Sequence, residues 1–411
     1  MVDFFKRKLN VLKESNGLRV NRALYVDDYL VSRDHATNRS LVNFSSNDYL
    51  GLASDLSLQT AFFNSLDIAD KANWMSASSA RPLTGTSLIH QELEMAIARD
   101  FSKHDDHNLK ALLFNSGYHA NSGILPALTD KNDLILADKL VHASIIDGLR
   151  LGKAKFMRFA HNDTEHLTSL LERYRNDYQR IWIVTESVFS MDGDIAPIKQ
   201  LVQLKKRYET LLYVDEAHAL GCYGLDGLGL CESLGLQQEV DMIVGVFGKA
   251  MAGVGAFAVG DEYLIDNLVN FARSWLFSTA LPPLNVAWNL YVWMQLATFQ
   301  QQRNQLQRLT HLFRQQLDNS DQLNLGETYI VPVMPSIDDS ENTANINNVK
   351  SNNRLVVELS QYLEDVGFLA LPIRYPTVKL GSERVRFSLT ANIPEQKIND
   401  VVLAIKRFVE K

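Results

Sequence analysis

Cysteine is almost absent from this chain of 411 residues, which contains only Cys222 and Cys231. Two thiols cannot build the disulfide framework of a small secreted domain. Their spacing also fails the common zinc motifs, so we expect no structural metal. Free thiols are typical of a reducing compartment, and we therefore expect a cytoplasmic protein.

The chain also lacks a long apolar run and an excess of basic charge. The longest apolar stretch, 281–297, contains two prolines and polar residues, so it predicts a core helix and not a membrane span. Residues 1–16 carry charges throughout and have no apolar core like that of a secretory signal. The 41 basic and 48 acidic side chains give a net charge of −7, which argues against a nucleic-acid surface.

Short apolar segments alternate with amphipathic ones through the middle of the chain. Strands are predicted at 111–116, 134–138, 180–187, 211–217 and 241–248, and helices at 88–101, 117–128, 143–152 and 198–208. This alternation predicts an α/β fold with a mainly parallel sheet covered on both faces. Ligands of such sheets bind at the carboxyl ends of the strands. We therefore expect one rim to carry Glu186, Ser187, Asp215, His218 and Lys249.

The composition suggests three parts: an N-terminal segment (1–45), a large domain (46–285) and a smaller α+β domain (286–411). Residues 25–32 and 39–46 are expected to form a hairpin or edge strands. In the last part we expect a long helical region to about 319, strands at 328–334, 368–373 and 384–390, and helices at 355–367 and 395–411. The polar segment 336–353 predicts a loose loop, and 338–353 has the character of an insertion.

Lys249 follows a predicted strand and has small neighbours: Gly248, Gly253 and Gly255. A lysine in this position is usually a surface residue, but small neighbours let a backbone approach a flat ligand closely. A desolvated lysine beside such a ligand can form a Schiff base, and pyridoxal 5'-phosphate is the usual aldehyde partner. Asp215 is then suited to keep the pyridine nitrogen protonated, and His218 to reach the phenolic oxygen. Without Lys249, Asp215 would be interpreted as a helix cap.

The phosphate of such a cofactor needs backbone donors at a helix N-terminus. The segment NSGYHANSG (115–123) follows a strand and opens a helix with Ser116 and Gly117, and Tyr118 is placed to lie against the ligand. Turns of this kind are common, so the signal is weak by itself.

Three further side chains suit the same pocket. Ser278 and Thr279 offer hydroxyl groups just before a helix that begins with proline. His142, in VHAS (141–144), is suited either to stack on the cofactor ring or to cap a helix.

The sequence resembles the α-oxoamine synthases, which are pyridoxal-phosphate enzymes of the aspartate-aminotransferase fold (fold type I). The similarity covers about residues 17–410. Its blocks, in the order of the family, are FSSNDYLGL (44–52), RPLTGTSLIHQELE (81–94), NSGYHANSG, DKLVHASIIDG (138–148), TESVFSMDGDIAPI (185–198), VDEAHALGCYGLDGLG (214–229), FGKAMAGVGA (247–256) and FSTALPP (277–283). The resemblance implies a homodimer whose sites are completed across the subunit interface, with small-molecule substrates and neither nucleic acid nor membrane as a partner.

The resemblance also implies individual roles. Lys249 would hold the cofactor and move the α-proton, Asp215 would pair with the pyridine nitrogen, and His218 with the ring oxygen. Further cofactor contacts are implied for His142, Ser116, Gly117, Tyr118, Glu186 and Ser190, and for Ser278 and Thr279 from the partner subunit. Asn47 and Arg386 would receive the amino-acid carboxylate, whereas Arg384 is expected on the surface. We also expect Arg19 and Arg22 to meet the acyl carrier or the acyl carboxylate.

Within the family, RFAHND (158–163) and residues 372–392 are most similar to one branch. That branch joins L-alanine to a pimeloyl thioester, with loss of CO2, to give 8-amino-7-oxononanoate for biotin synthesis. Other branches join glycine to acetyl-CoA or make long-chain aminoketone signals, and MSAS (75–78) resembles the signal synthases. The sequence leaves open the acyl length, the carrier (coenzyme A or acyl carrier protein) and the strictness for alanine over glycine or serine.

The chain departs from the family pattern at two places. SASSARPLTG (76–85) stands where the family has a glycine-rich stretch, and Val246 stands where a Thr or Ser usually binds the phosphate. A phosphate oxygen left unpaired would cost about 1–3 kcal/mol.

Two rival interpretations are weaker. DEAH (215–218) is also a helicase signature, but a helicase needs an upstream phosphate loop, and the nearest match, IVGVFGKA (243–250), lies downstream and lacks the first glycine. A cofactor-binding homologue without activity is not supported, because every implied catalytic residue is present: Lys249, Asp215, His218, His142 and Arg386.

Overall fold

The computed structural model describes residues 2–14, 18, 21–32, 40–66, 74–102, 108–317, 326–335, 346–375 and 377–410. Contacts within the chain divide it into two compact units. Unit 1 consists of Met1–Ser54, Met191–Asp194 and Asn304–Lys411, and unit 2 of Asp55–Ser190 and Ile195–Arg303. The three parts expected from the sequence (1–45, 46–285 and 286–411) remain a proposal.

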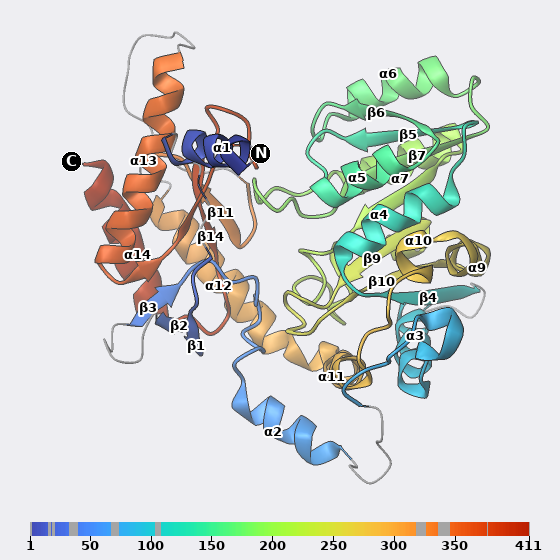
Figure 1. Cartoon of the computed structure of the whole chain (residues 1–411), viewed down its shortest axis with the longest axis horizontal. Coiled ribbons are helices and arrows are strands. Elements are labelled where there is room, and N and C mark those ends of the chain that lie inside the picture. The colour runs from blue at the N-terminus through green and yellow to red at the C-terminus, as the bar shows by residue number, and fades with distance from the viewer. Residues whose placement is uncertain are drawn as a thin grey trace. The chain divides into compact units, whose positions relative to one another are not determined.

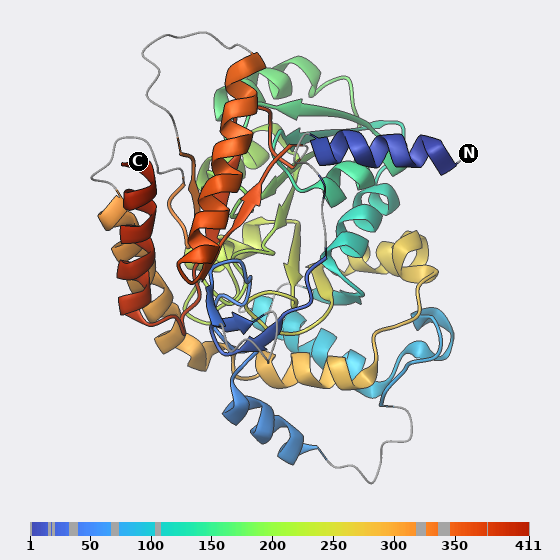
Figure 2. The ribbon, with the colours of Figure 1, turned by 60° about the vertical axis from the view of Figure 1, so that its left-hand side comes forward.

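Unit 2 is built on a seven-stranded sheet with the order β4-β10-β9-β8-β7-β5-β6 (Figures 1 and 2). Its strands are β4 (Leu109–Phe114), β5 (Asp133–Asp138), β6 (Lys155–Phe159), β7 (Arg180–Glu186), β8 (Leu211–Asp215), β9 (Met242–Val246) and β10 (Ala256–Asp261). The five strands from β9 to β6 are parallel, and β10 runs antiparallel to both β9 and β4. The prediction of a mainly parallel sheet is confirmed, although the sequence did not identify β6 or β10.

Helices and short helical turns connect the strands of unit 2. They are α2 (Leu56–Ser65), η2 (Arg81–Gly85), α3 (Leu88–Phe101), α4 (Gly117–Leu128), α5 (Ala143–Leu151), α6 (Thr164–Tyr174), α7 (Ile198–Tyr208), α8 (Leu230–Ser233), η3 (Gln237–Glu239), α9 (Glu262–Phe271), α10 (Arg273–Leu276), α11 (Pro283–Trp293) and η4 (Leu296–Phe299). α12 (Gln300–Leu317) begins in unit 2 and continues in unit 1.

Side chains of β10 alternate between the two faces of the sheet. Ala256 and Ala258 belong to the apolar core that includes residues of α4, α5 and α9. Phe257, between them, contacts Phe101 of α3 and Trp293 of α11, with ring centroids 6.0 and 5.5 Å apart. Because successive residues of a strand point to opposite faces, helices cover the sheet on both sides.

Unit 1 carries two smaller sheets with the orders β1-β2-β3-β12 and β11-β14-β13 (Figure 2). Its elements are α1 (Val2–Glu14), β1 (Tyr25–Asp27), β2 (Leu30–Ser32), β3 (Ser40–Asn43), β11 (Ile330–Val333), α13 (Ile346–Asp365), β12 (Phe368–Leu369), β13 (Leu371–Ile373), β14 (Arg384–Ser388) and α14 (Glu395–Val409). The hairpin predicted near the N-terminus is confirmed by the antiparallel pairs of β2 with β1 and β3. β3 pairs in parallel with β12, which joins the N-terminal strands to the C-terminal part of the chain.

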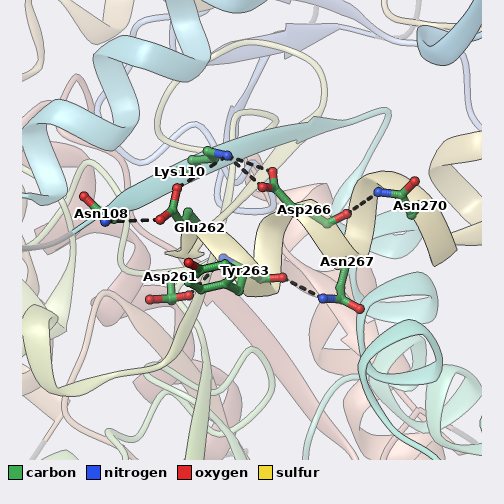
Figure 3. Close-up of polar contacts among 8 residues, drawn as sticks. All are labelled: Asn108, Lys110, Asp261, Glu262, Tyr263, Asp266, Asn267 and Asn270. Atoms are coloured by element: carbon green, nitrogen blue, oxygen red, sulfur yellow. Dashed lines mark hydrogen bonds and ion pairs between the residues drawn. The ribbon is translucent and has the colours of Figure 1, made fainter.

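Edge strand β4 is tied to α9 by charged side chains (Figure 3). Lys110 lies 2.8 Å from Asp266 and 3.7 Å from Glu262, and Asn108 donates to Glu262 at 3.1 Å. Asp261 caps α9 by accepting from the backbone N–H of Tyr263 at 2.9 Å. A lysine at this position also discourages pairing with another strand at the sheet edge.

Arg384 is not on the surface, as the sequence analysis expected. Its side chain is buried, and it donates to Asp192 at 2.5 Å and to the carbonyl of Met191 at 3.1 Å, within unit 1. Arg384 and Arg386 are two residues apart on β14, so both point to the same face of the sheet.

The polar segment 336–353 is not a loop throughout. α13 begins at Ile346, and the residues before it (336–345) lie outside the described residues, as do Asn16, Gly17 and Arg19. In the sequence, Ile346 and Val349 continue the apolar spacing of Val356 and Leu359, a pattern that favours helix.

The apolar stretch 281–297 forms α11 and the start of η4, with Val286, Ala287 and Val292 buried in the core of unit 2. This confirms the core helix predicted from the sequence. Among the described residues, no helix combines the length and the hydropathy that a membrane span requires.

Arg303, near the start of α12, is only 1% exposed. Its guanidinium donates to the carbonyls of Leu296 at 2.9 Å, Ala297 at 3.0 Å and Leu225 at 3.0 Å. Burial lowers the pKa of Arg303 below its ordinary value. This side chain therefore joins the loop after β8 to the turn between α11 and α12.

We expect Arg303→Met to lower the free energy of unfolding by roughly 3 kcal/mol, because several buried carbonyls would lose their donor. Equilibrium urea unfolding measures this loss. The control is Arg308→Met on the same helix, whose side chain is 58% exposed and whose loss should change stability by less than about 0.5 kcal/mol. Equal effects of the two substitutions would contradict the assignment.

Candidate active site

The strands β7, β8 and β9 bring chemically active side chains to one edge of the sheet. Glu186 is the last residue of β7 and lies opposite Asp215, the last residue of β8. Asp215 in turn lies opposite Val244 of β9, and Lys249 follows the end of that strand. The structure therefore brings Glu186, Asp215 and Lys249 together at the carboxyl ends of parallel strands, where such sheets bind ligands.

Both carboxylate oxygens of Asp215 are bound by the protein. Oδ2 accepts from Nδ2 of Asn121 at 2.7 Å, and Oδ1 accepts from the backbone N–H of Ala217 at 2.8 Å. The side chain is buried, and a buried carboxylate needs such donors. These two bonds fix the orientation of the carboxylate toward the rim.

Lys249 lies in a tight turn between β9 and β10. The N–H of Ala252 donates to the carbonyl of Lys249 at 2.9 Å, and the N–H of Gly253 to that of Phe247 at 2.8 Å. A Cβ at Gly253 would stand 2.0 Å from Oδ1 of Asn289, so only glycine fits there. Close packing therefore accounts for Gly253, whereas a Cβ at Gly248 would meet nothing nearer than 3.7 Å.

The N-terminus of α4 lies at the same edge of the sheet. Ser116 caps this helix by accepting from the N–H of His119 at 3.3 Å. A Cβ at Gly117 would lie 2.8 Å from Cγ2 of Val246, so the valine packs directly against the glycine. Val246 thus fills with a methyl group the position where the family usually places a hydroxyl.

His142 caps the N-terminus of α5. Its Nδ1 accepts from the backbone N–H of Ser144 at 3.2 Å and lies 2.7 Å from Oγ of Ser144. Desolvation lowers the pKa of His142 below its ordinary value, and the charge of Lys249 adds to this effect. Asp215 and Asp147 act in the opposite direction.

Glu186 is the carboxyl group most disturbed by its surroundings. It is 3% exposed, and its Oε1 has no hydrogen-bond partner among the described residues. Burial and the charge of Asp215 raise the pKa of Glu186 well above its ordinary value, against the opposing effect of Lys249. A buried carboxyl oxygen without a partner at this rim is what a bound ligand would satisfy.

The turn that carries His218 is held by Glu216. This buried carboxylate accepts from Oγ of Ser187 at 2.5 Å and from the N–H groups of Leu230 and Cys231 at 3.0 and 2.7 Å. Burial raises the pKa of Glu216 above its ordinary value. His218 itself is buried two residues further along the same turn.

Four other predicted residues also belong to unit 2: Tyr118, Ser190, Ser278 and Thr279. The hydroxyl of Tyr118 donates to Asp147 at 2.8 Å, and its ring is half exposed. Thr279 forms a bridge with Ala80, and its neighbour Ser278 is partly buried. Ser190 is partly buried at the end of its segment of unit 2.

The predicted carboxylate-binding residues belong to unit 1. Arg386 is buried and donates to Oδ1 of Asn47 at 3.2 Å, to Oγ of Ser388 at 2.8 Å and to the hydroxyl of Tyr49 at 3.4 Å. These three contacts hold the guanidinium at a fixed place on β14. Arg22, by contrast, forms an ion pair with Glu364 at 2.9 Å.

Three polar residues that sequence analysis missed complete the cluster in unit 2. Asn121 binds Asp215, Tyr213 donates to Oδ1 of Asn121 at 2.5 Å, and Ser144 accepts from Nδ2 of Asn121 at 3.0 Å. All three are buried. The sequence signal for Asn121 was a polar residue among the apolar and small residues of α4.

The residues of unit 2 fit pyridoxal 5'-phosphate. α4 begins at Gly117, so its N-terminal N–H groups suit a phosphate, and Glu186 has an unsatisfied oxygen. Asp215, with both oxygens held, suits a protonated ring nitrogen, and Lys249 supplies the amine.

Comparisons with known proteins agree with this chemistry. Residues 39–405 match the family of aminotransferase class I and II. The 8-amino-7-oxononanoate synthase of Haemophilus ducreyi is 47% identical over 98% of this chain and 100% of the relative. A serine palmitoyltransferase from S. paucimobilis, solved with bound PLP–myriocin aldimine, has a TM-score of 0.84 and 27% identity over 99% and 96% of the two chains. The 8-amino-7-oxononanoate synthase of Francisella tularensis has a TM-score of 0.70 and 29% identity over 90% and 98%.

Asp48, next to Asn47, titrates near neutrality. It accepts from the N–H groups of Leu52 at 3.0 Å and Ala53 at 2.9 Å. Burial nevertheless raises the pKa of Asp48 from 3.8 to about 6, with Asp28 adding to the effect. The folded protein therefore holds this proton more tightly than the unfolded chain does.

It follows that Asp48 contributes stability that is fully present below pH 3.8 and is lost as the pH rises to about 6. We expect the unfolding free energy of the wild type, measured relative to Asp48→Asn, to fall by at most about 3 kcal/mol across this range. The comparison cancels the titrating groups that do not interact with Asp48. Urea unfolding at several pH values tests this, and a difference that stays constant or rises with pH would contradict it.

Proposed function

The chain belongs to the aminotransferase class I and II family and, within it, to the α-oxoamine synthases, and on this basis we propose that it makes 8-amino-7-oxononanoate from L-alanine and a pimeloyl thioester. Its fold is that of the fold type I enzymes, and it is a pyridoxal-phosphate-dependent acyltransferase. The single observation that carries the proposal is the similarity to 8-amino-7-oxononanoate synthases along almost the whole chain.

The atoms of the product identify the two substrates. The amine-bearing carbon and the terminal methyl group of 8-amino-7-oxononanoate are those of alanine without its carboxylate. The remaining carbons, from the ketone to the far carboxylate, are those of a pimeloyl group. The balanced reaction therefore forms one carbon–carbon bond, releases the carboxylate of alanine as CO2 and frees the thiol of the carrier.

The residues of unit 2 would hold the cofactor and move the protons. When bound, pyridoxal 5'-phosphate supplies an electron sink that stabilises negative charge at the α-carbon of the amino acid. Lys249 would bind the cofactor aldehyde and then carry the α-proton, and Asp215 would keep the ring nitrogen protonated. The other proposed contacts are His142, His218, Ser116, Gly117, Tyr118, Glu186 and Ser190, with Ser278 and Thr279 reaching the site of the partner subunit in a homodimer.

Arg386 and Asn47 would bind the carboxylate of the amino acid. Support comes from the buried guanidinium of Arg386, which Asn47, Tyr49 and Ser388 hold in place. A carboxylate is the natural partner for such a group. Arg22 is proposed to reach the acyl donor, in competition with its ion pair to Glu364.

A second candidate is another α-oxoamine synthase, one that uses a different acyl group or amino acid. It draws support from the structural similarity to serine palmitoyltransferase, whose TM-score of 0.84 exceeds the 0.70 of the Francisella relative. The sequence identity of 47% to the Haemophilus protein favours the first candidate.

A substrate panel distinguishes these candidates. We expect purified enzyme with pyridoxal 5'-phosphate to release CO2 fastest with L-alanine and pimeloyl-CoA or pimeloyl-acyl carrier protein. Glycine and serine, and acetyl-CoA and decanoyl-CoA, serve as comparison substrates. A higher kcat/KM with glycine plus acetyl-CoA, or with a long acyl chain, would replace the proposed substrates.

Lys249→Ala tests the proposed role of the amine. The variant should lose the visible absorbance that pyridoxal 5'-phosphate gains on reacting with a lysine, and kcat should fall by more than about 100-fold, because no base remains for the α-proton. Lys206→Ala, with a side chain that is 58% exposed, is the control and should retain both properties. Unchanged turnover in Lys249→Ala would remove this lysine from the mechanism.

A further inference from the structure

We propose that Asn121 and Ser144 are positioning residues that hold Asp215 and His142 in fixed places relative to each other. Asn121 orients Asp215, and Ser144 fixes His142 with its proton on Nε2. The inference rests on the proposed function for the roles of Asp215 and His142. Its geometry lies within unit 2 and involves only buried hydrogen bonds.

The amide of Asn121 has one possible orientation. Nδ2 faces Oδ2 of Asp215 at 2.7 Å, and an ionised carboxylate can only accept. Oδ1 faces the hydroxyl of Tyr213 at 2.5 Å. Burial raises the pKa of Tyr213 well above its ordinary value, so this hydroxyl remains a donor at any working pH. A flipped amide would place its oxygen against Oδ2 of Asp215, with two acceptors together, and it is therefore excluded.

The orientation of Asn121 passes to Ser144. The second hydrogen on Nδ2 of Asn121 is donated to Oγ of Ser144 at 3.0 Å. Oγ of Ser144 lies 2.7 Å from Nδ1 of His142, and its hydrogen is directed there because the backbone N–H of Ser144 requires an unprotonated Nδ1. The backbone N–H of Ser144 also donates to Nδ1, at 3.2 Å.

Two donors on Nδ1 leave no room for a proton on that nitrogen. His142 is therefore neutral and carries its hydrogen on Nε2, in agreement with its lowered pKa. A neutral ring with Nε2–H presents a donor, so His142 is suited to bind an oxygen of the substrate and not to remove a proton through Nε2. Lys249 is then the residue that acts as the base for the α-proton.

One amide thus serves two parts of the pocket. Asn121 spans from the carboxylate for the ring nitrogen to the hydroxyl that orients the histidine. Asp215 would hold the ring nitrogen of the cofactor and His142 would contact its ring, so the positions of these two side chains relative to each other matter for binding. The amide of Asn121 fixes these relative positions before the cofactor binds.

The test uses the full-length protein labelled with ¹⁵N only in histidine, with and without pyridoxal 5'-phosphate. Nitrogen chemical shifts distinguish a protonated ring nitrogen from an unprotonated one, and His142→Asn identifies the signal. We expect His142 to be the Nε2–H tautomer in both states. A signal with the proton on Nδ1 would overturn the proposal.

Ser144→Ala removes one donor to Nδ1 and should shift the tautomer ratio toward Nδ1–H by roughly 3- to 10-fold, the value of one hydrogen bond. Its affinity for pyridoxal 5'-phosphate should change little, because Asn121 still binds Asp215. Ser122→Ala, on α4 and outside these hydrogen bonds, is the matched control. An unchanged ratio in Ser144→Ala, or an equal shift in Ser122→Ala, would refute the role of Ser144.

Asn121→Ala removes the donor to Asp215 and should raise the Kd for pyridoxal 5'-phosphate by roughly 10- to 100-fold, as for a hydrogen bond to a charged group. It should also shift the tautomer of His142 in the same direction as Ser144→Ala, by a smaller factor. In the double variant the tautomer should match Ser144→Ala alone. An unaltered Kd, or additive tautomer shifts, would contradict the shared role of Asn121.

If Asn121→Ala fails to fold, Tyr213→Phe replaces it, since losing the hydroxyl removes one of the bonds that hold the amide against Asp215 and should raise the Kd in the same direction by a smaller factor. These readouts are independent of the substrate. Should the expected tautomer occur in a protein that turns over no amino acid with any acyl thioester, the proposed function fails and the positioning role stands. If the enzyme turns over its substrates but His142 carries its proton on Nδ1, the proposed function stands and the positioning role fails.

Discussion

A carboxylate buried at the end of a central strand is the constraint on which unit 2 depends. Asp215 is buried, so a charge on its carboxylate requires hydrogen-bond donors in fixed places. One of them, Asn121, belongs to α4, the helix whose N-terminus is suited to a phosphate. A Cβ at Gly148 would come within 2.4 Å of the carbonyl of Asn121, so α5 packs closely on the same turn. Helix packing thereby fixes the position of Asp215 relative to the N-terminus of α4.

Much of this arrangement was predictable from the sequence. Buried parallel strands appear as short apolar runs, so β5, β7, β8 and β9 were located, and the polar residues at their ends followed. The family, its fold and its cofactor were identified from motifs and are confirmed by the comparisons. The residue roles within the site, which rest on that resemblance, remain predictions.

The rest depended on contacts that no local pattern reveals. Asn121 and Asp215 are 94 residues apart in the chain, and a polar residue on a helix is usually interpreted as solvent-facing. β10 was missed because its antiparallel return follows the turn of Lys249 directly, within one apolar run. The error at Arg384 was avoidable, since residues i and i+2 of a strand share a face and Arg386 was already assigned inward.

The segment Met191–Asp194 belongs to unit 1, whereas the residues on either side of it belong to unit 2. Asp192 is bound there by Arg384, and the carbonyl of Gly193 accepts from the hydroxyl of Thr328 at 2.9 Å. Neither unit is therefore a contiguous stretch of the gene. A fragment that ends at Arg303 would contain residues 191–194 without Arg384 and Thr328, to which they are bonded. A single cut in the chain therefore does not separate the two units, and neither does recombination at a single crossover.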